Sequence, residues 1–184
     1  MSSFAPSKAA QERFEHLVEQ KLEALLTKIG RPFLSRRQVK VTAMHKPVVV
    51  WFEIRLPKRL FPQLRWGIPV VGFEIESSGA AQSIKAAINN LEALKPALGC
   101  IIIPKKVAER KRAERWGSRY VGLTVKQAVE YLASKSWLSI VVLTDERIDD
   151  FTTGRDEVRD RVVLNALIQQ VTKGFERPTP SCGT

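Results

Sequence analysis

Two glutamates, Glu74 and Glu76, stand near the end of the apolar run "VVGFEIES". The run is rich in β-branched and aromatic residues, which predicts a strand. Side chains alternate along a strand, so the two carboxylates share one face and the apolar residues between them form the core face. Paired acids on a buried strand are typical of a functional site, and the plain alternative is a solvated strand end.

Glu53 lies on the preceding apolar run, "VVVWFEIRL". If the two runs pair as a hairpin, Glu53 can lie near Glu74 and Glu76. Three carboxylates in a low dielectric repel one another, and a hard divalent cation such as Mg²⁺ or Mn²⁺ offsets that repulsion because it prefers oxygen ligands. The alternative for Glu53 is a plain ion pair with Arg55 or a neighbouring lysine.

Lys85 falls about one turn into a helical pattern, "GAAQSIKAAINNLEALKP", that follows a Ser-Ser-Gly break. From there it can lean over the strand ends. Acids that hold a metal, together with a lysine that polarises a phosphate or a water, are the working parts of metal-assisted phosphodiester hydrolysis. The alternative places Lys85 on the solvated face of an amphipathic helix.

The spacing of apolar residues and the positions of Gly and Pro predict an alternation of helices and strands. We expect one α/β domain over 1–175, with a mixed central sheet flanked by helices, and a flexible tail over 176–184. The expected helices cover 7–30, 79–96, 105–118, 124–134 and 156–175, and the expected strands cover 39–44, 48–56, 70–77, 99–104 and 137–144.

The chain is strongly basic, with 30 Lys and Arg against 19 Asp and Glu and a net charge of +11. This balance favours a polyanionic partner, most simply nucleic acid, and DNA is the first expectation. The alternative is a solvated surface of i, i+4 ion pairs. The basic residues gather in two segments, and the expected nucleic-acid contacts are Arg36, Arg37, Lys58, Arg59, Arg65, Lys105, Lys106, Arg110, Lys111, Arg112 and Arg115.

Several other functions are disfavoured by the composition. Two cysteines and two histidines give neither a disulfide framework nor a zinc ligand pair. The chain has no Gly-rich phosphate loop, no HExxH motif, no signal-peptide pattern and no apolar run long enough to span a bilayer. We therefore expect a cytoplasmic protein.

The order of elements and acids resembles the PD-(D/E)xK nuclease superfamily, also called the restriction-endonuclease-like fold. That family's core is α-β-β-β-α-β, which residues 7–104 match, with further C-terminal helices and a strand. The resemblance implies a Mg²⁺- or Mn²⁺-dependent nuclease in which Glu53, Glu74 and Glu76 are catalytic metal ligands and Lys85 is the catalytic lysine. An acid on the first helix, Glu19 or Glu23, would match an extra ligand that some members carry.

The chain departs from the family motif at two points. The Pro-Asp dipeptide is missing, since Pro69 is followed by Val70, and Glu76 replaces the lysine of the third strand. Some members move that lysine to the following helix, and others only bind nucleic acid. Two alternatives therefore stay open, a catalytically degenerate nucleic-acid-binding protein on the same fold and a basic protein-interaction subunit. A homodimer stays open as well.

Overall fold

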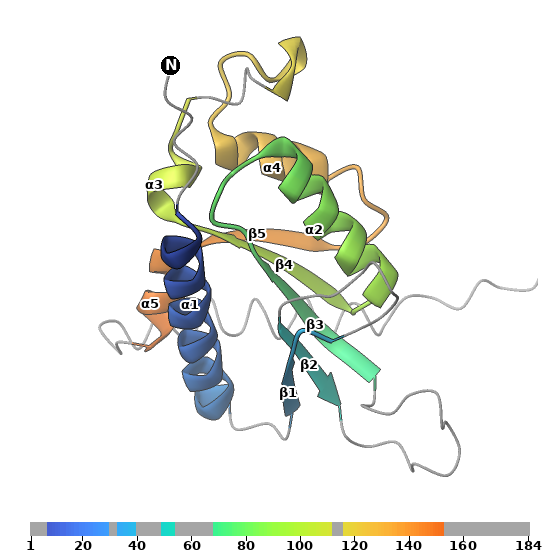
Figure 1. Ribbon diagram of the computed structural model, residues 1–184. Helices are drawn as coiled ribbons and strands as arrows, with labels where there is room; N and C mark the ends of the chain where they lie inside the picture. The colour runs from blue at the N-terminus through green and yellow to red at the C-terminus, as the bar shows by residue number, and fades with distance from the viewer. Residues whose placement is uncertain (1–6, 30–32, 40–48, 54–67, 112–115, 153–184) are drawn as a thin grey trace, which may run out of the picture.

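A five-stranded sheet forms the middle of three layers in the computed structural model (Figure 1), which describes residues 7–29, 33–39, 49–53, 68–111 and 116–152. Its strands follow the order of the chain: β1 (Phe33–Arg37), β2 (Val49–Glu53), β3 (Ile68–Ile75), β4 (Leu98–Ile103) and β5 (Ile140–Thr144). The helices are α1 (Lys8–Ile29), α2 (Ala81–Leu94), α3 (Lys105–Ala108), the 3₁₀ helix η2 (Ser118–Tyr120), α4 (Val125–Ala133) and α5 (Asp145–Thr152).

The sheet is mixed, and its two halves differ in direction. β1, β2 and β3 pair antiparallel, whereas β3, β4 and β5 pair parallel. The parallel half is joined by helical crossovers, as parallel strands require. As a consequence, the carboxyl ends of β3, β4 and β5 all meet at one edge of the sheet, where ligands of α/β proteins commonly bind.

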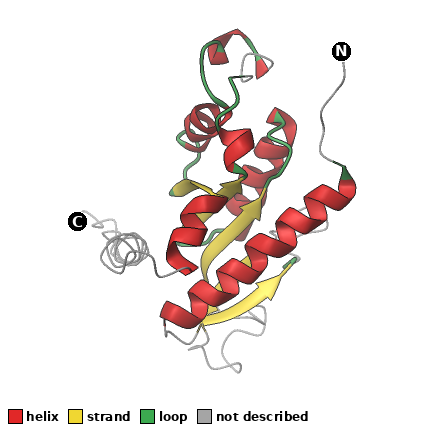
Figure 2. Cartoon of the chain, turned by 90° about the vertical axis from the view of Figure 1, so that its left-hand side faces the viewer, coloured by secondary structure: helices red, strands yellow, loops and turns green. Residues whose placement is uncertain are grey.

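The helix α1 covers one face of the sheet, together with α5. Val18, Leu22 and Leu25 form its buried stripe and pack in one cluster with Phe73 and Ile75 of β3. Figure 2 shows α1 lying along this face of the strands. The three- and four-residue spacing of the stripe explains why this segment is a helix.

The helices α2 and α4 cover the opposite face. Gly72 of β3 lies under α2 so closely that a Cβ atom there would come within 2.8 Å of Leu94 Cδ2 and 2.9 Å of Leu91 Cδ2. α4 begins with a capping box in which Thr124 and Gln127 each accept a hydrogen bond from the other's backbone. The strand between these layers, β4, is buried at every position, as expected for a central parallel strand.

The mixed α/β class is confirmed, and α1, α2, β3, β4, α4 and β5 lie where the sequence predicts them. The segment 31–37 is not among the expected strands, but Phe33–Arg37 forms β1. This strand lies at the edge of the sheet, where charged residues are tolerated, and its arginines concealed it. Of the predicted strand 39–44, Val39 is not in a strand and the rest lies outside the described residues.

Two helix predictions also need correction. The basic helix expected over 105–118 ends at Ala108, and the acidic helix α5 was not predicted. The predicted closing helix 156–175 and the tail 176–184 lie outside the described residues.

Candidate functional site

Glu74 lies near the carboxyl end of β3 on the face covered by α2, and it is only 6% exposed. Asn90 of α2 donates a hydrogen bond to its carboxylate, while the Oε1 atom has no hydrogen-bond partner among the described residues. Burial raises the pKa of Glu74 to about 8, opposed by the hydrogen bond from Asn90 and increased further by the charges of Glu76 and Glu15. The side chain is therefore mostly protonated at neutral pH.

Glu76 follows directly after β3 and is half-buried. Its backbone N–H donates to the Ile102 carbonyl of β4 over 2.9 Å, which continues the ladder one residue beyond the strand. Its Oε1 atom accepts hydrogen bonds from the Ser78 backbone N–H, at 2.7 Å, and from the Ser78 hydroxyl. The Ser-Ser-Gly break thus fixes the Glu76 carboxylate at the end of β3.

Glu15 reaches the same region from α1. It is half-buried, and its pKa is raised by burial first and then by the charges of Glu19, Glu76 and Glu12. Because the buried residue Val18 lies one turn further along α1, Glu15 stands at the border between the packed stripe and solvent. We call Glu15, Glu74 and Glu76 the β3 acid cluster.

The two acids that the resemblance suggested on the first helix are occupied differently. Arg37 of β1 forms an ion pair with Glu19 at 3.1 Å and with Glu23 at 2.8 Å. Both carboxylates are therefore engaged by one guanidinium. Arg37, which is also predicted to contact nucleic acid, ties β1 to α1 through these ion pairs.

The expected convergence of Glu53 with Glu74 and Glu76 is wrong. In the pairing of β2 with β3, Glu53 lies opposite Ile68, at the start of β3. Glu74 is six residues further along that strand, or roughly 20 Å at about 3.3 Å per residue. The physical reason is direction: in an antiparallel pair the end of β2 meets the start of β3, whereas Glu74 is near its end.

Lys85 is exposed on α2. It stands five residues before Asn90, which corresponds to about 140° around a helix of 3.6 residues per turn. The side of α2 that reaches Glu74 through Asn90 is therefore not the side that carries Lys85.

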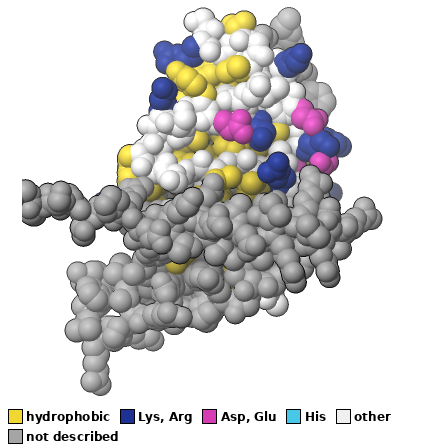
Figure 3. Space-filling model, turned by 180° about the vertical axis from the view of Figure 1, so that it is seen from behind, with side chains coloured by type: hydrophobic (Ala, Val, Ile, Leu, Met, Phe, Trp, Pro, Cys, Tyr) yellow, Lys and Arg dark blue, Asp and Glu magenta, His cyan; other side chains and the backbone are white. Residues whose placement is uncertain are grey.

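The predicted nucleic-acid contacts are scattered over the described surface. Arg36, Lys106 and Lys111 are exposed, Arg110 is half-buried, and Lys105 forms an ion pair with Glu146 at 2.8 Å. Figure 3 shows Lys and Arg side chains next to Asp and Glu on the face seen from behind, rather than a uniformly basic surface. The other expected contacts lie outside the described residues: Lys58, Arg59, Arg65, Arg112 and Arg115.

The donor atoms of the β3 acid cluster suit a hard cation, because they are carboxylate oxygens and one of them, Glu74 Oε1, lacks a partner. Across the described part of the chain, however, no three His, Cys, Asp or Glu side chains are grouped so that they could hold a metal ion. The charges of these glutamates thus repel one another, but their side chains do not form a metal-ligand set.

Sequence reasoning missed two members of this region, Glu15 and Asn90. A signal for Glu15 was present, since the acids at 12, 15, 19 and 23 follow helical spacing beside the apolar stripe of α1. Asn90 had no such signal, because its role depends on how α2 is placed over β3.

Comparisons with known proteins give no relative for this chain: no family model, no curated protein and no solved structure matches it. Within the described residues, no helix is both long enough and apolar enough to cross a membrane. What the protein does must therefore be argued from its own residues.

Proposed function

We propose that this chain is a metal-dependent nuclease, acting first of all on DNA, with the β3 acid cluster as its centre. One observation carries the proposal: Glu74 is a buried carboxyl group with an oxygen that lacks any hydrogen-bond partner. Buried polar atoms are nearly always paired, and an orphaned one calls for an explanation such as an ion. A bound cation would supply the partner and favour the ionised carboxylate.

The residues of the cluster would divide the work. Glu74 and Glu76 would hold Mg²⁺ or Mn²⁺, which when bound polarises a phosphate and lowers the pKa of a water. Glu15 would add negative charge near the ion without belonging to its ligand set. Asn90 orients Glu74, and Ser78 orients Glu76. Such outer contacts fix the direction of metal-ligating carboxylates.

The fold supports a restriction-endonuclease-like arrangement as part of this proposal. The elements α1, β1, β2, β3, α2 and β4 follow the α-β-β-β-α-β order of the PD-(D/E)xK core. The acids at the end of the third strand stand where that family carries its acid-x-lysine motif. In this proposal Glu53 and Lys85 are left out of the centre.

A catalytically degenerate nucleic-acid-binding protein is the second candidate. Two observations favour it: the register separates Glu53 from Glu74, and the described residues contain no formed metal-ligand group. The two candidates differ in whether Glu74 takes part in chemistry.

A cleavage assay separates the two candidates. Supercoiled plasmid, single-stranded DNA and branched DNA are each incubated with Mg²⁺, Mn²⁺ or EDTA. We expect metal-dependent nicking that falls on the order of 100-fold or more in Glu74→Gln, because a ligand oxygen and its charge are lost. Glu92→Gln is the matched control, since Glu92 is a half-buried carboxylate on α2 that accepts a hydrogen bond from Ser136 instead.

The possible results assign the protein to one candidate or to neither. Nicking that is lost in Glu74→Gln and kept in Glu92→Gln supports the nuclease. DNA binding without cleavage in either metal supports the degenerate binder. Cleavage that is equally strong in Glu74→Gln would contradict a centre at the β3 acid cluster.

A further inference from the structure

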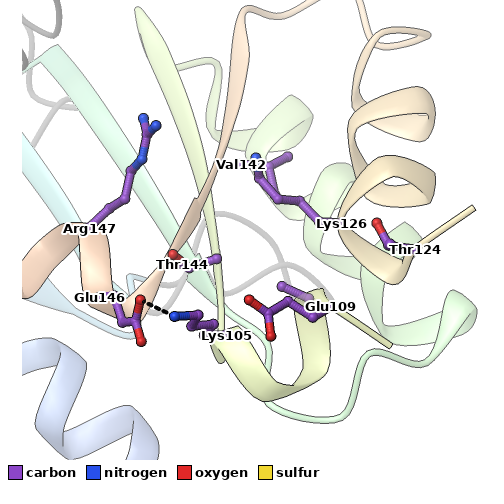
Figure 4. Close-up of a pocket in the computed structure, with 9 residues that line it drawn as sticks. Lys105, Glu109, Thr124, Lys126, Val142, Thr144, Glu146 and Arg147 are labelled. Atoms are coloured by element: carbon purple, nitrogen blue, oxygen red, sulfur yellow. Dashed lines mark ion pairs between the residues drawn. The ribbon is translucent and has the colours of Figure 1, made fainter. Parts of the chain in front are cut away.

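A second polar site lies on the same edge of the sheet. A pocket of about 190 Å³ opens at the carboxyl ends of β4 and β5. The residues that line the pocket come from three sides (Figure 4). Lys105 and Glu109 belong to α3 and the residue that follows it, and Thr124 and Lys126 belong to the start of α4. Thr144 ends β5, and Glu146 and Arg147 follow in α5.

The pocket has three cationic side chains and two carboxylates, so its net charge is positive. Lys105 Nζ lies 2.8 Å from Glu146 Oε2. Lys126 Nζ lies 3.0 Å from Glu130, which is one turn along α4 and does not line the pocket. Arg147 extends away from the Lys105 and Glu146 pair (Figure 4), and no ion pair holds it within the described part of the chain.

The ion pairs of Lys105 and Lys126 are exposed enough for each lysine to exchange its glutamate for another anion. The Lys105, Glu146, Lys126 and Glu130 side chains are between 40% and 55% exposed. Ion pairs at such exposure are weak, so a phosphate that enters the pocket can replace the glutamates. Thr124 adds a hydroxyl: its oxygen already accepts from the Gln127 backbone, which leaves the hydrogen to donate to an anion.

The walls of the pocket are held together by backbone contacts. The Lys105 N–H donates to Asp145 Oδ1 over 2.7 Å, which joins the start of α3 to the start of α5. The Val125 N–H donates to the Arg110 carbonyl over 2.9 Å, which joins the segment after α3 to the start of α4. The cationic side chains therefore extend from a fixed frame.

The pocket and the β3 acid cluster are separated by about two strand spacings. Ile75 at the end of β3 pairs with Ile102, and Ile103 at the end of β4 pairs with Thr144. Neighbouring strands lie about 4.8 Å apart, so the two sites are roughly 10 Å apart along the edge. A separation of this size lets both sites contact the backbone of one nucleic-acid strand.

We propose that this pocket binds a backbone phosphate of the nucleic acid, on the same strand as the phosphate at the β3 acid cluster. Lys105, Lys126 and Arg147 supply the positive charge. The contact fixes the register of the strand on the protein and reads no base, as phosphate contacts do. The inference rests on the proposed function, because it names where the substrate of that site continues.

The test measures binding and not cleavage. A labelled DNA duplex is titrated in EDTA at several salt concentrations, with the full chain and with the double variant Lys126→Ala, Arg147→Ala. We expect the variant to bind more weakly, and the slope of log affinity against log salt to become shallower by about 0.9, which corresponds to one lost phosphate contact. Glu109→Gln should bind more tightly, since it removes a carboxylate from the pocket.

Lys135→Ala is the matched control. Lys135 is exposed just beyond the far end of α4, roughly 13 Å from Lys126 at 1.5 Å per residue, and its substitution removes one positive charge where the double variant removes two. An unchanged slope in the control and a shallower slope in the double variant support the pocket. An equal effect in both would show a general charge effect and overturn the proposal, and so would an unchanged slope in the double variant.

Two further outcomes separate the possible failures. If inorganic phosphate binds the wild type and not the double variant, while duplex affinity is the same in both, the pocket takes free phosphate and the proposal is overturned. If the slope changes as expected and no metal supports cleavage, the pocket stands and the nuclease proposal fails. A wild-type chain that binds no DNA contradicts both.

Discussion

The two polar sites at the carboxyl edge of the sheet differ in how far water reaches them. The β3 acid cluster lies at the carboxyl end of β3, where Glu74, under α2, is 6% exposed with its pKa raised to about 8. The pocket beyond β4 and β5 holds ion pairs whose side chains stay about half-exposed. Burial makes the charge of a carboxyl group depend on pH near neutrality and on nearby cations, whereas exposed ion pairs are weak and can exchange partners. One edge therefore carries a buried carboxyl group with a raised pKa and an exposed set of ion pairs.

The largest expected effect is the free-energy cost of ionising the buried Glu74 carboxyl group in the folded chain. The pKa is about 8 in the folded chain against 4.5 in the absence of burial, so the folded state holds a proton that the unfolded state releases. The free energy of unfolding should be highest below pH 4.5 and fall as the pH rises through 8. The total fall due to this group is on the order of 4 kcal/mol.

Urea unfolding in EDTA at pH 5, 7 and 9 measures this fall. Glu74→Gln cannot ionise, so its stability should exceed that of the wild type by a growing margin as the pH rises. Mg²⁺ or Mn²⁺ at pH 9 should restore part of the wild-type stability and leave Glu74→Gln unchanged, because only the carboxylate gains a partner. A constant difference between the two proteins from pH 5 to 9 would contradict the raised pKa.

The next effect concerns the packing that keeps water from Glu74. Gly72→Ala places a Cβ atom 2.8 Å from Leu94 and 2.9 Å from Leu91, so α2 must shift away from β3. We expect a loss of about 1 to 3 kcal/mol in the free energy of unfolding. Because α2 covers Glu74 and burial is the main cause of its raised pKa, we also expect a lower pKa for Glu74 as water enters, which a flatter dependence of stability on pH would reveal.

Gly99→Ala is the comparison for this change. Gly99 lies in β4, and its added Cβ atom would approach Leu91 and Ile140 only to 3.1 Å. We expect it to cost less than Gly72→Ala and to leave the pH dependence as it is. If both substitutions lowered the free energy of unfolding equally, α2 would pack no more closely on β3 than on β4.

Sequence periodicity was sufficient for the elements that are buried and amphipathic. The stripe of α1 and the apolar run of β4 depend on local spacing, so they could be predicted. Elements stabilised by charge could not. β1 contains Arg36 and Arg37, and α5 contains four acids, so composition concealed both. An edge strand and an exposed helix obtain their stability from neighbours that a local pattern does not show.

The candidate site was predicted in part for the same reason. Alternation along β3 correctly grouped Glu74 with Gly72, on the face under α2. The placement of Glu53 required the register of β2 with β3, and a long connection leaves that register open in the sequence. Glu15 and Asn90 required the positions of two helices over the sheet. Local patterns give the face of a residue, and only packing gives its neighbours.

A smaller effect is expected at the frame of the pocket. Asp145→Ala removes the acceptor of the Lys105 N–H, which is one of the contacts that join α3 to α5. Because water can replace this exposed bond, we expect a loss of only about 0.5 to 1 kcal/mol in urea unfolding. The loss should not depend on pH between 7 and 9, in contrast with Glu74. A loss as large as that of Gly72→Ala would mean that the pocket is not the weakly held region.

The smallest effect on stability is expected from the ion pair between Lys126 and Glu130 on α4. Glu130→Gln removes an exposed pair at i, i+4, and such pairs contribute about 0.3 to 0.5 kcal/mol. Lys126 then has no carboxylate partner to leave when a phosphate enters the pocket, so DNA affinity in EDTA should rise although stability falls. Urea unfolding and a DNA titration on the same variant check the two directions together. If stability and affinity fell together, Lys126 would affect DNA binding through the stability of α4 rather than through its charge. That result would contradict the electrostatic contrast between the buried site and the exposed site.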